Sequence, residues 1–83
     1  MLLRKIQRGL YKVVDDQNNN YRVEDLTRSY VEFQRPEEGE FTQYRWGIWE
    51  HNEGEWMYLD SNETLKDCLV VIEAWATALE IGK

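Results

Sequence analysis

The hydrophobic pattern of the C-terminal segment has the period of an α-helix. Its apolar residues form a single stripe: Leu65, Cys68, Leu69, Ile72, Trp75, Ala76 and Leu79. Ser61, Asn62 and Thr64 are all suitable capping residues, and Thr64 followed by Asp67 resembles a capping box, with aspartate in place of the usual glutamate. The pattern therefore predicts an amphipathic helix from about Glu63 to Glu80, with Leu69 and Ile72 at the centre of its buried face.

Nearer the N-terminus, two short segments are rich in residues that favour β-strands. Leu10–Val14 and Tyr21–Val23 flank the polar run Asp15–Asn20. Asparagine and aspartate tolerate left-handed backbone conformations and bond to nearby backbone groups, so this run is typical of a turn. We therefore predict an antiparallel hairpin.

The next segment is ambiguous between helix and strand. Apolar residues between Val23 and Phe33 recur at helical spacing, but the β-branched and aromatic residues around them favour a strand. We prefer a strand over Thr27–Gln34 and keep a helix as the alternative. The polar run Pro36–Glu40 ends this element and is expected to form a turn.

A second hairpin is indicated by the alternation of side chains in Phe41–Trp49, with Trp56–Leu59 as the partner strand. The connection His51–Gly54 suits a four-residue loop built on a type I turn, with Gly54 at a positive φ. A three-residue loop with a bulge at Gly54 is the alternative, and it would shift the strand pairing by one residue.

The four-residue loop decides which side chains share a face of this hairpin. It pairs Glu50 with Glu55, and Trp49 with Trp56. One face then carries mainly apolar residues: Tyr44, Trp46, Ile48, Met57 and Leu59. The other face carries Arg45, Gly47, Trp49, Trp56 and Tyr58. We expect the C-terminal helix to cover the first face and to leave the second facing away from it.

Together these elements predict an α+β fold, namely an antiparallel β-meander of four or five strands with one long C-terminal α-helix packed on one face. The chain has 83 residues, and we expect residues 1–83 to form a single domain. A chain of this length buries only about 60–65% of the surface that its unfolded form exposes. Little volume remains for an enclosed active site, so an enzyme is not expected.

The net charge of −6 is unevenly distributed along the chain. Residues 1–35 carry seven basic and five acidic residues, whereas residues 36–83 carry three basic and eleven acidic residues. An acidic half of this kind would repel a phosphate backbone, so nucleic acid is disfavoured as a partner and a basic protein is favoured. The absence of a long apolar run and of secretion-signal features predicts no membrane partner and a cytoplasmic location.

Three features could carry chemistry, and each has a simpler structural interpretation. Asp16–Asn20 matches the opening of a calcium-binding loop, but the sixth and twelfth positions hold Tyr21 and Thr27 instead of glycine and glutamate. His51 is the only histidine and lies at an expected hairpin tip, which is a poor preorganised metal site. Cys68 lies on the apolar helical stripe and is expected to be a buried, unreactive thiol. We therefore expect no cofactor and no metal.

The aromatic content of the chain suggests a binding surface, because four tryptophans and five tyrosines exceed what a small core encloses. We expect Trp46 and Trp75 to fill the core. The candidate binding residues are Trp49, Trp56, Tyr58 and Arg45, with an acidic rim of Glu50, Glu53, Glu55, Glu37 and Glu38. Tryptophan, tyrosine and arginine are enriched at the energetic centres of protein interfaces. The alternatives are that an extra strand or the N-terminal segment covers this face, or that the pair of Trp49 and Trp56 only stabilises the hairpin.

These observations favour a small acidic protein-interaction module that regulates or inhibits another protein, with a second copy of the chain as one form of partner. One alternative is single-stranded nucleic acid or nucleobase binding, with bases stacked on the aromatic face. Another alternative is an acidic mimic of nucleic acid, which would block a DNA- or RNA-binding protein. The three hypotheses differ in whether the aromatic side chains or the carboxylates make the decisive contacts.

Overall fold

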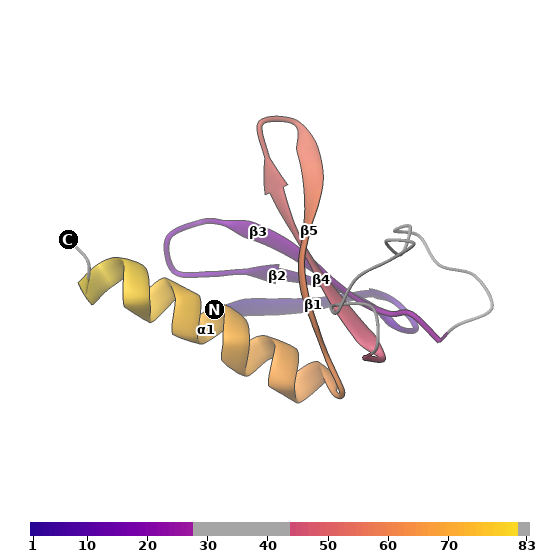
Figure 1. The fold of residues 1–83 in the computed structure, drawn as a ribbon. Helices are drawn as coiled ribbons and strands as arrows, with labels where there is room; N and C mark the ends of the chain where they lie inside the picture. Colours follow the sequence, from indigo (N-terminus) through magenta and orange to yellow (C-terminus); the bar gives the residue numbers. More distant parts are fainter. Residues whose placement is uncertain (28–43, 82–83) are drawn as a thin grey trace.

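Consecutive strands pair side by side in the computed structural model, which describes residues 1–27 and 44–81, with side chains as far as Ala76. The elements are β1 (Leu2–Gln7), β2 (Leu10–Val14), β3 (Asn20–Asp25), β4 (Trp46–Asn52), β5 (Glu55–Asn62) and α1 (Leu65–Ile81). The sheet order is β1-β2-β3-β4-β5, and every neighbouring pair is antiparallel. Helix α1 lies along one side of the sheet (Figure 1). The predicted α+β meander with a C-terminal helix is therefore confirmed.

Strand β1 is the element that the hydrophobic pattern did not predict. Its sequence has charged residues between its apolar ones and no alternation, and all six of its residues are exposed. It pairs with β2 through a tight connection at Gly9, whose φ is +80°. The segment Thr27–Gln34, where we preferred a strand over a helix, and the turn Pro36–Glu40 lie almost wholly outside the described residues.

The loop between β4 and β5 has two residues, so the expected four-residue loop is wrong. Asn52 pairs with Glu55 across the loop residues Glu53 and Gly54. Both loop residues have positive φ, 52° for Glu53 and 83° for Gly54, as in a type I′ turn. We did not expect Glu53 in this conformation because asparagine and aspartate adopt it more readily than glutamate.

The corrected loop shifts the pairing by two residues near the turn and therefore preserves the division of the hairpin into two faces. Trp49 pairs with Tyr58 instead of Trp56. A bulge then follows beyond Trp49, because Ile48 pairs with the residue after Leu59. Leu59 and Ile48 both lie with the core side chains under α1.

The hydrophobic core lies between the sheet and α1. Its fully or almost fully buried members come from β2, β3, β4 and α1: Val13, Tyr21, Val23, Ile48, Cys68 and Ile72. The partly buried side chains packed against it include the expected Trp46, Leu69 and Trp75. On the helix, Ile72 is thus central, as predicted, and Leu69 lies at the margin. We call the sheet face that carries this core the helix face, and the opposite one the far face.

Helix α1 begins at Leu65, directly after the residue that caps it. The Thr64 hydroxyl accepts a hydrogen bond from the backbone N–H of Asp67 at 3.1 Å, and the Thr64 carbonyl accepts the first helical bond from Cys68. The capping role that the sequence predicted for Thr64 is therefore present. This cap directs the helix back along the sheet from the end of β5 (Figure 1).

Candidate interaction surface

Trp49 lies on the far face but is only 4% exposed. Its ring stands edge-on to Tyr58, with ring centroids 5.2 Å apart and an interplanar angle of 71°. The ring also lies directly over Gly47, because a Cβ placed on that glycine would be 2.7 Å from two ring carbons. The expectation that Trp49 is an exposed contact residue is therefore not met. Trp49 is instead a buried packing residue of the far face.

Trp56 is the more accessible tryptophan of the hairpin, at 36% exposed. It pairs with His51 across the hairpin, and the two rings are 4.9 Å apart. The guanidinium of Arg22, from β3, lies 4.6 Å from the centroid of the Trp56 ring, a geometry in which cation and ring attract. Burial lowers the pKa of Arg22 from its usual value. The arginine that accompanies this aromatic group is thus Arg22.

Arg45, the arginine that the sequence placed among these aromatic residues, instead contacts Asp25 at the end of β3. The guanidinium donates to a carboxylate oxygen of Asp25 at 2.7 Å, and it lies 5.8 Å from the Trp46 ring. The second oxygen of Asp25 accepts hydrogen bonds from the hydroxyl and the backbone N–H of Thr27. The hydrogen bond from Arg45 outweighs burial and lowers the pKa of Asp25 to about 2.

The tip of the β4–β5 hairpin collects three of the five carboxylates that we placed in the acidic rim. We define the hairpin tip as residues 50–57. Glu53 and Glu55 are exposed and Glu50 is half-buried, while Glu37 and Glu38 lie outside the described residues. Met57 pairs with Glu50 and is 50% exposed. The hairpin extends beyond the β2–β3 hairpin beside it (Figure 1). The tip thus exposes a tryptophan on one face and a methionine on the other, with glutamates in the same segment.

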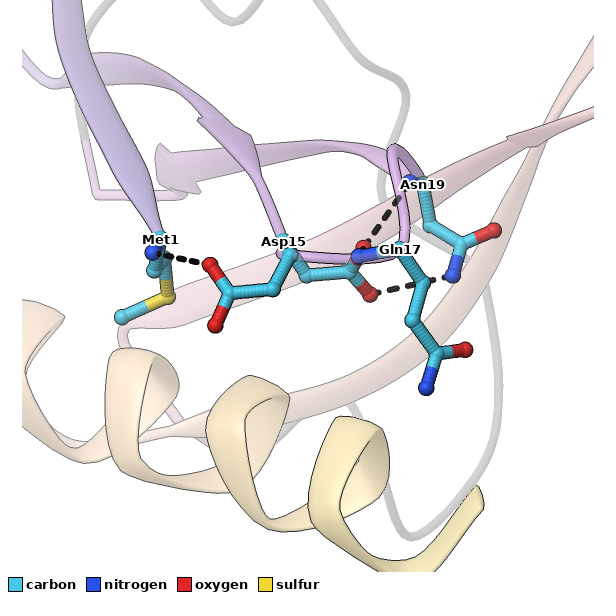
Figure 2. Close-up of polar contacts among 5 residues, drawn as sticks. Met1, Asp15, Gln17 and Asn19 are labelled. Atoms are coloured by element: carbon cyan, nitrogen blue, oxygen red, sulfur yellow. Dashed lines mark hydrogen bonds and ion pairs between the residues drawn. The ribbon is translucent and has the colours of Figure 1, made fainter. Parts of the chain in front are cut away.

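In the turn between β2 and β3, the carboxylate of Asp15 accepts hydrogen bonds from other residues of the same turn. Asp15 accepts hydrogen bonds from the backbone N–H groups of Gln17 and Asn19, both at 2.9 Å, and from the Asn19 side chain (Figure 2). Burial raises the pKa of Asp15, but these bonds and one from Tyr21 more than offset that effect, so the pKa is lowered. Its neighbour Asp16 holds the Met1 ammonium at 2.7 Å. The turn is therefore organised by N–H donors, which supports the structural interpretation of the calcium-like pattern.

The chemical groups singled out in the sequence do not assemble into a reactive centre among the described residues. Cys68 is fully buried, and burial raises the pKa of its thiol to about 12 despite opposing hydrogen bonds from Asn62. In residues 1–27 and 44–81, no three histidine, cysteine, aspartate or glutamate side chains are grouped so that they could hold a metal ion. Within the same ranges, no helix has the length and apolar character needed to cross a membrane.

The far face also carries a line of basic side chains that the sequence did not predict, because the line depends on the registers of three strands. Arg4 pairs with Lys12, Lys12 pairs with Arg22, and Arg22 pairs with Trp49. Three cations therefore lie in one line across β1, β2 and β3; we call them the cationic row. No ion pair involves any of the three within the described part of the chain. The spacing of the basic residues along the chain, eight and ten positions apart, gave no sign of this.

Comparison with known proteins does not assign the chain to a family: no family model matches it, and neither a curated protein nor a solved structure shows significant similarity.

Proposed function

We propose that this chain is a small acidic protein-interaction module, which regulates or inhibits another protein, and that the hairpin tip is its contact surface. The proposal rests on the exposure of Trp56 and Met57 at the tip of a hairpin that extends past its neighbours (Figure 1). Large apolar side chains presented in this way frequently mark a partner's binding site. Tryptophan in particular contributes strongly to binding energy when a partner encloses it.

The geometry around Trp56 supports its role as an anchor. Arg22 and His51 both contact the ring, and these contacts reduce the rotational freedom that is lost when a partner binds. In the same hairpin, the edge-on contact of Trp49 with Tyr58 adds to the pairing between β4 and β5. A preorganised anchor of this kind favours slow dissociation of the complex.

The charge at the tip favours a basic partner. Glu53 and Glu55 are exposed beside the anchor, and Glu50 lies next to Met57. Carboxylates at the rim of an interface mainly accelerate encounter with a positively charged partner, and they reject acidic ones. The partner that best fits the tip is therefore a protein with an apolar pocket bordered by lysine or arginine.

The two alternative functions have less support. Base stacking on the far face would need accessible rings, but Trp49 is 4% exposed and stands edge-on to its neighbour. A mimic of nucleic acid would need carboxylates spaced along a backbone-like path, whereas Glu50, Glu53 and Glu55 gather at one end of the described molecule. Neither alternative gives a role to the exposed apolar residues of the tip, Trp56 and Met57.

The test compares the wild-type chain with the double variant Trp56→Ala/Met57→Ala. Each protein serves as bait in a lysate of the source organism, and a captured protein is then purified and its Kd measured by calorimetry. We expect the double variant to weaken binding by tenfold or more, since an enclosed tryptophan contributes about 2 kcal/mol or more. The matched control is Val70→Ala, which removes an exposed apolar side chain of α1 and should leave the Kd unchanged.

Thermal unfolding of all three proteins shows whether the variants remain folded, and both sites are exposed enough for this to be expected. If the double variant melts cooperatively and still binds the captured protein with the wild-type Kd, the tip is not the contact surface. Equal losses in the double variant and in Val70→Ala would also contradict the proposal, because nonspecific apolar adhesion would then explain the capture.

A further inference from the structure

Strand β1 forms one edge of the sheet and exposes apolar side chains along its length. It pairs only with β2 among the described residues, so every second residue directs its backbone N–H and C=O groups away from the sheet. Leu2, Leu3 and Ile6 are 58%, 44% and 49% exposed. An edge with accessible backbone groups and apolar side chains can accept an additional strand from another chain.

The cationic row begins at this edge with Arg4, so it favours an added strand that carries negative charge. Arg4 lies opposite Lys12, and like charges directly opposite each other in a sheet are mutually destabilising. A carboxylate on a strand beside β1, opposite Arg4, would lie at the end of the row and reduce this repulsion. Lys5, which points to the helix face, offers a second cation to the same strand.

The same charges act against a second copy of the chain as the occupant. In the three antiparallel registers with the greatest overlap, β1 paired with itself places Arg4 opposite Arg4, Arg4 opposite Lys5, or Lys5 opposite Lys5. Each of these registers places two cations directly opposite each other, which is unfavourable. Charged side chains and bulges are known devices that protect edges from self-pairing, and β1 also has a register shift between Lys5 and Gln7.

We infer that β1 is a second docking site, separate from the hairpin tip, and that it takes an extended acidic and apolar segment of another protein as a sixth strand. Backbone hydrogen bonds to the outward groups of β1 supply part of the affinity. A carboxylate opposite Arg4 supplies the selectivity, and apolar side chains on the helix face of the added strand cover Leu3. The site does not depend on the proposed function of the tip.

The probe is a fluorescein-labelled heptapeptide of alternating valine and glutamate, compared with one of alternating valine and lysine. Binding to the full chain is followed by fluorescence anisotropy, and hydrogen exchange of the β1 amides is followed by NMR. We expect the acidic peptide alone to bind and to slow exchange at alternate β1 residues. Arg4→Glu should weaken its binding about fivefold, since an exposed attraction is replaced by repulsion.

Lys66→Glu is the matched control, because it reverses one exposed charge on α1 and should leave the Kd unchanged. Trp56→Ala/Met57→Ala should also retain peptide binding, so failure of this site and failure of the hairpin tip can be told apart. Equal binding of the two peptides, or binding without slower β1 exchange, would overturn the inference. Tighter binding of a short thymidine oligonucleotide that displaces the peptide would overturn it too, since the row would then serve a nucleic acid.

Discussion

Asp25 holds its carboxylate between an arginine and a threonine at the end of β3. One oxygen accepts a bond from Arg45 and the other accepts two from Thr27, while the side chain is 9% exposed. Because the contact joins β3 to the residue just before β4, it helps to bring together two strands that are distant in sequence. A carboxylate bound in this way is stabilised in its charged form.

This contact makes a pH-dependent contribution to stability. The folded pKa of Asp25 is about 2, below the unfolded value of 3.8, so the contribution is complete above pH 4 and is lost as the pH falls towards 2. We expect Asp25→Asn to lower the free energy of unfolding by about 1 kcal/mol at pH 6, after allowing for solvent screening at the exposed Arg45. Urea unfolding of both proteins between pH 2 and pH 6 measures the difference.

The difference in the free energy of unfolding between wild type and Asp25→Asn should fall towards zero between pH 4 and pH 2. Comparing the two proteins removes the effect of other carboxylates, including Asp15, whose pKa is also lowered. A difference that stays constant down to pH 2 would show that the aspartate contributes through shape or hydrogen bonding and not through its charge.

Side-chain burial was the part of the candidate site that the sequence could not predict. Trp49 and Trp56 are both tryptophans on one face of one hairpin, yet one is 4% exposed and the other 36%. The difference depends on Gly47, which leaves room for the Trp49 ring directly over the backbone. A local pattern assigns a residue to a face, but it does not tell how the side chains on that face pack.

Between β4 and β5, the type I′ turn places a glutamate in a conformation that it adopts poorly. Glu53 has φ of 52°, where an L-residue with a long side chain is strained and asparagine is tolerated. Gly54, at φ of 83°, is well suited to its position. The turn therefore has one favourable and one unfavourable residue.

Replacing the unfavourable residue should stabilise the protein. We expect Glu53→Asn to raise the free energy of unfolding by about 0.5–1 kcal/mol, because Asn-Gly is the preferred pair in this turn. Chemical denaturation measures the change. Glu55→Asn removes the same charge at a strand position and should give no stabilisation, so equal gains in both variants would mean that reduced repulsion, and not turn geometry, is responsible.

Elements with strong local signals were predicted well, and those determined by contacts across the sheet were not. The helix, its Thr64 cap and the β2–β3 hairpin follow from periodicity, capping and turn residues. Strand β1 has no alternating pattern because it lies at an edge with both faces exposed, and tertiary pairing with β2 alone makes it a strand. The hairpin register failed because one positive φ fell on a residue that seldom adopts it.

For the molecule as a whole, the reactivity of the Cys68 thiol shows whether α1 remains packed on the sheet. The thiol is fully buried, its Sγ lies 3.8 Å from the Trp46 carbonyl oxygen, and its pKa is raised to about 12. We expect no reaction with a disulfide reagent such as DTNB at pH 8 in the native protein, and reaction of the chain's one thiol in denaturant. Rapid reaction under native conditions, measured by absorbance, would indicate that the helix detaches readily.

The cationic row and the carboxylates of the hairpin tip come from different strands of the sheet. The cationic row lies across β1, β2 and β3, whereas Glu50, Glu53 and Glu55 lie on the β4–β5 hairpin. The count of charges along the chain anticipated a basic first part and an acidic second part. Only the strand registers align the basic residues in one row, which is why the sequence suggested the acidic surface and missed the basic one.

The order of the strands also has a consequence for how the chain folds. Three of the four ladders join strands that are close in sequence, but the β3–β4 ladder joins Asp25 to Trp46 and must bring together the two strands that lie furthest apart along the chain among neighbouring pairs. The β1–β3 meander and the β4–β5 hairpin can therefore form early and separately, and their union is expected to limit the folding rate. The β1 edge and its cationic row would then be complete within the first unit, whereas the contact between Arg22 and Trp56 at the hairpin tip would form only when the two units meet.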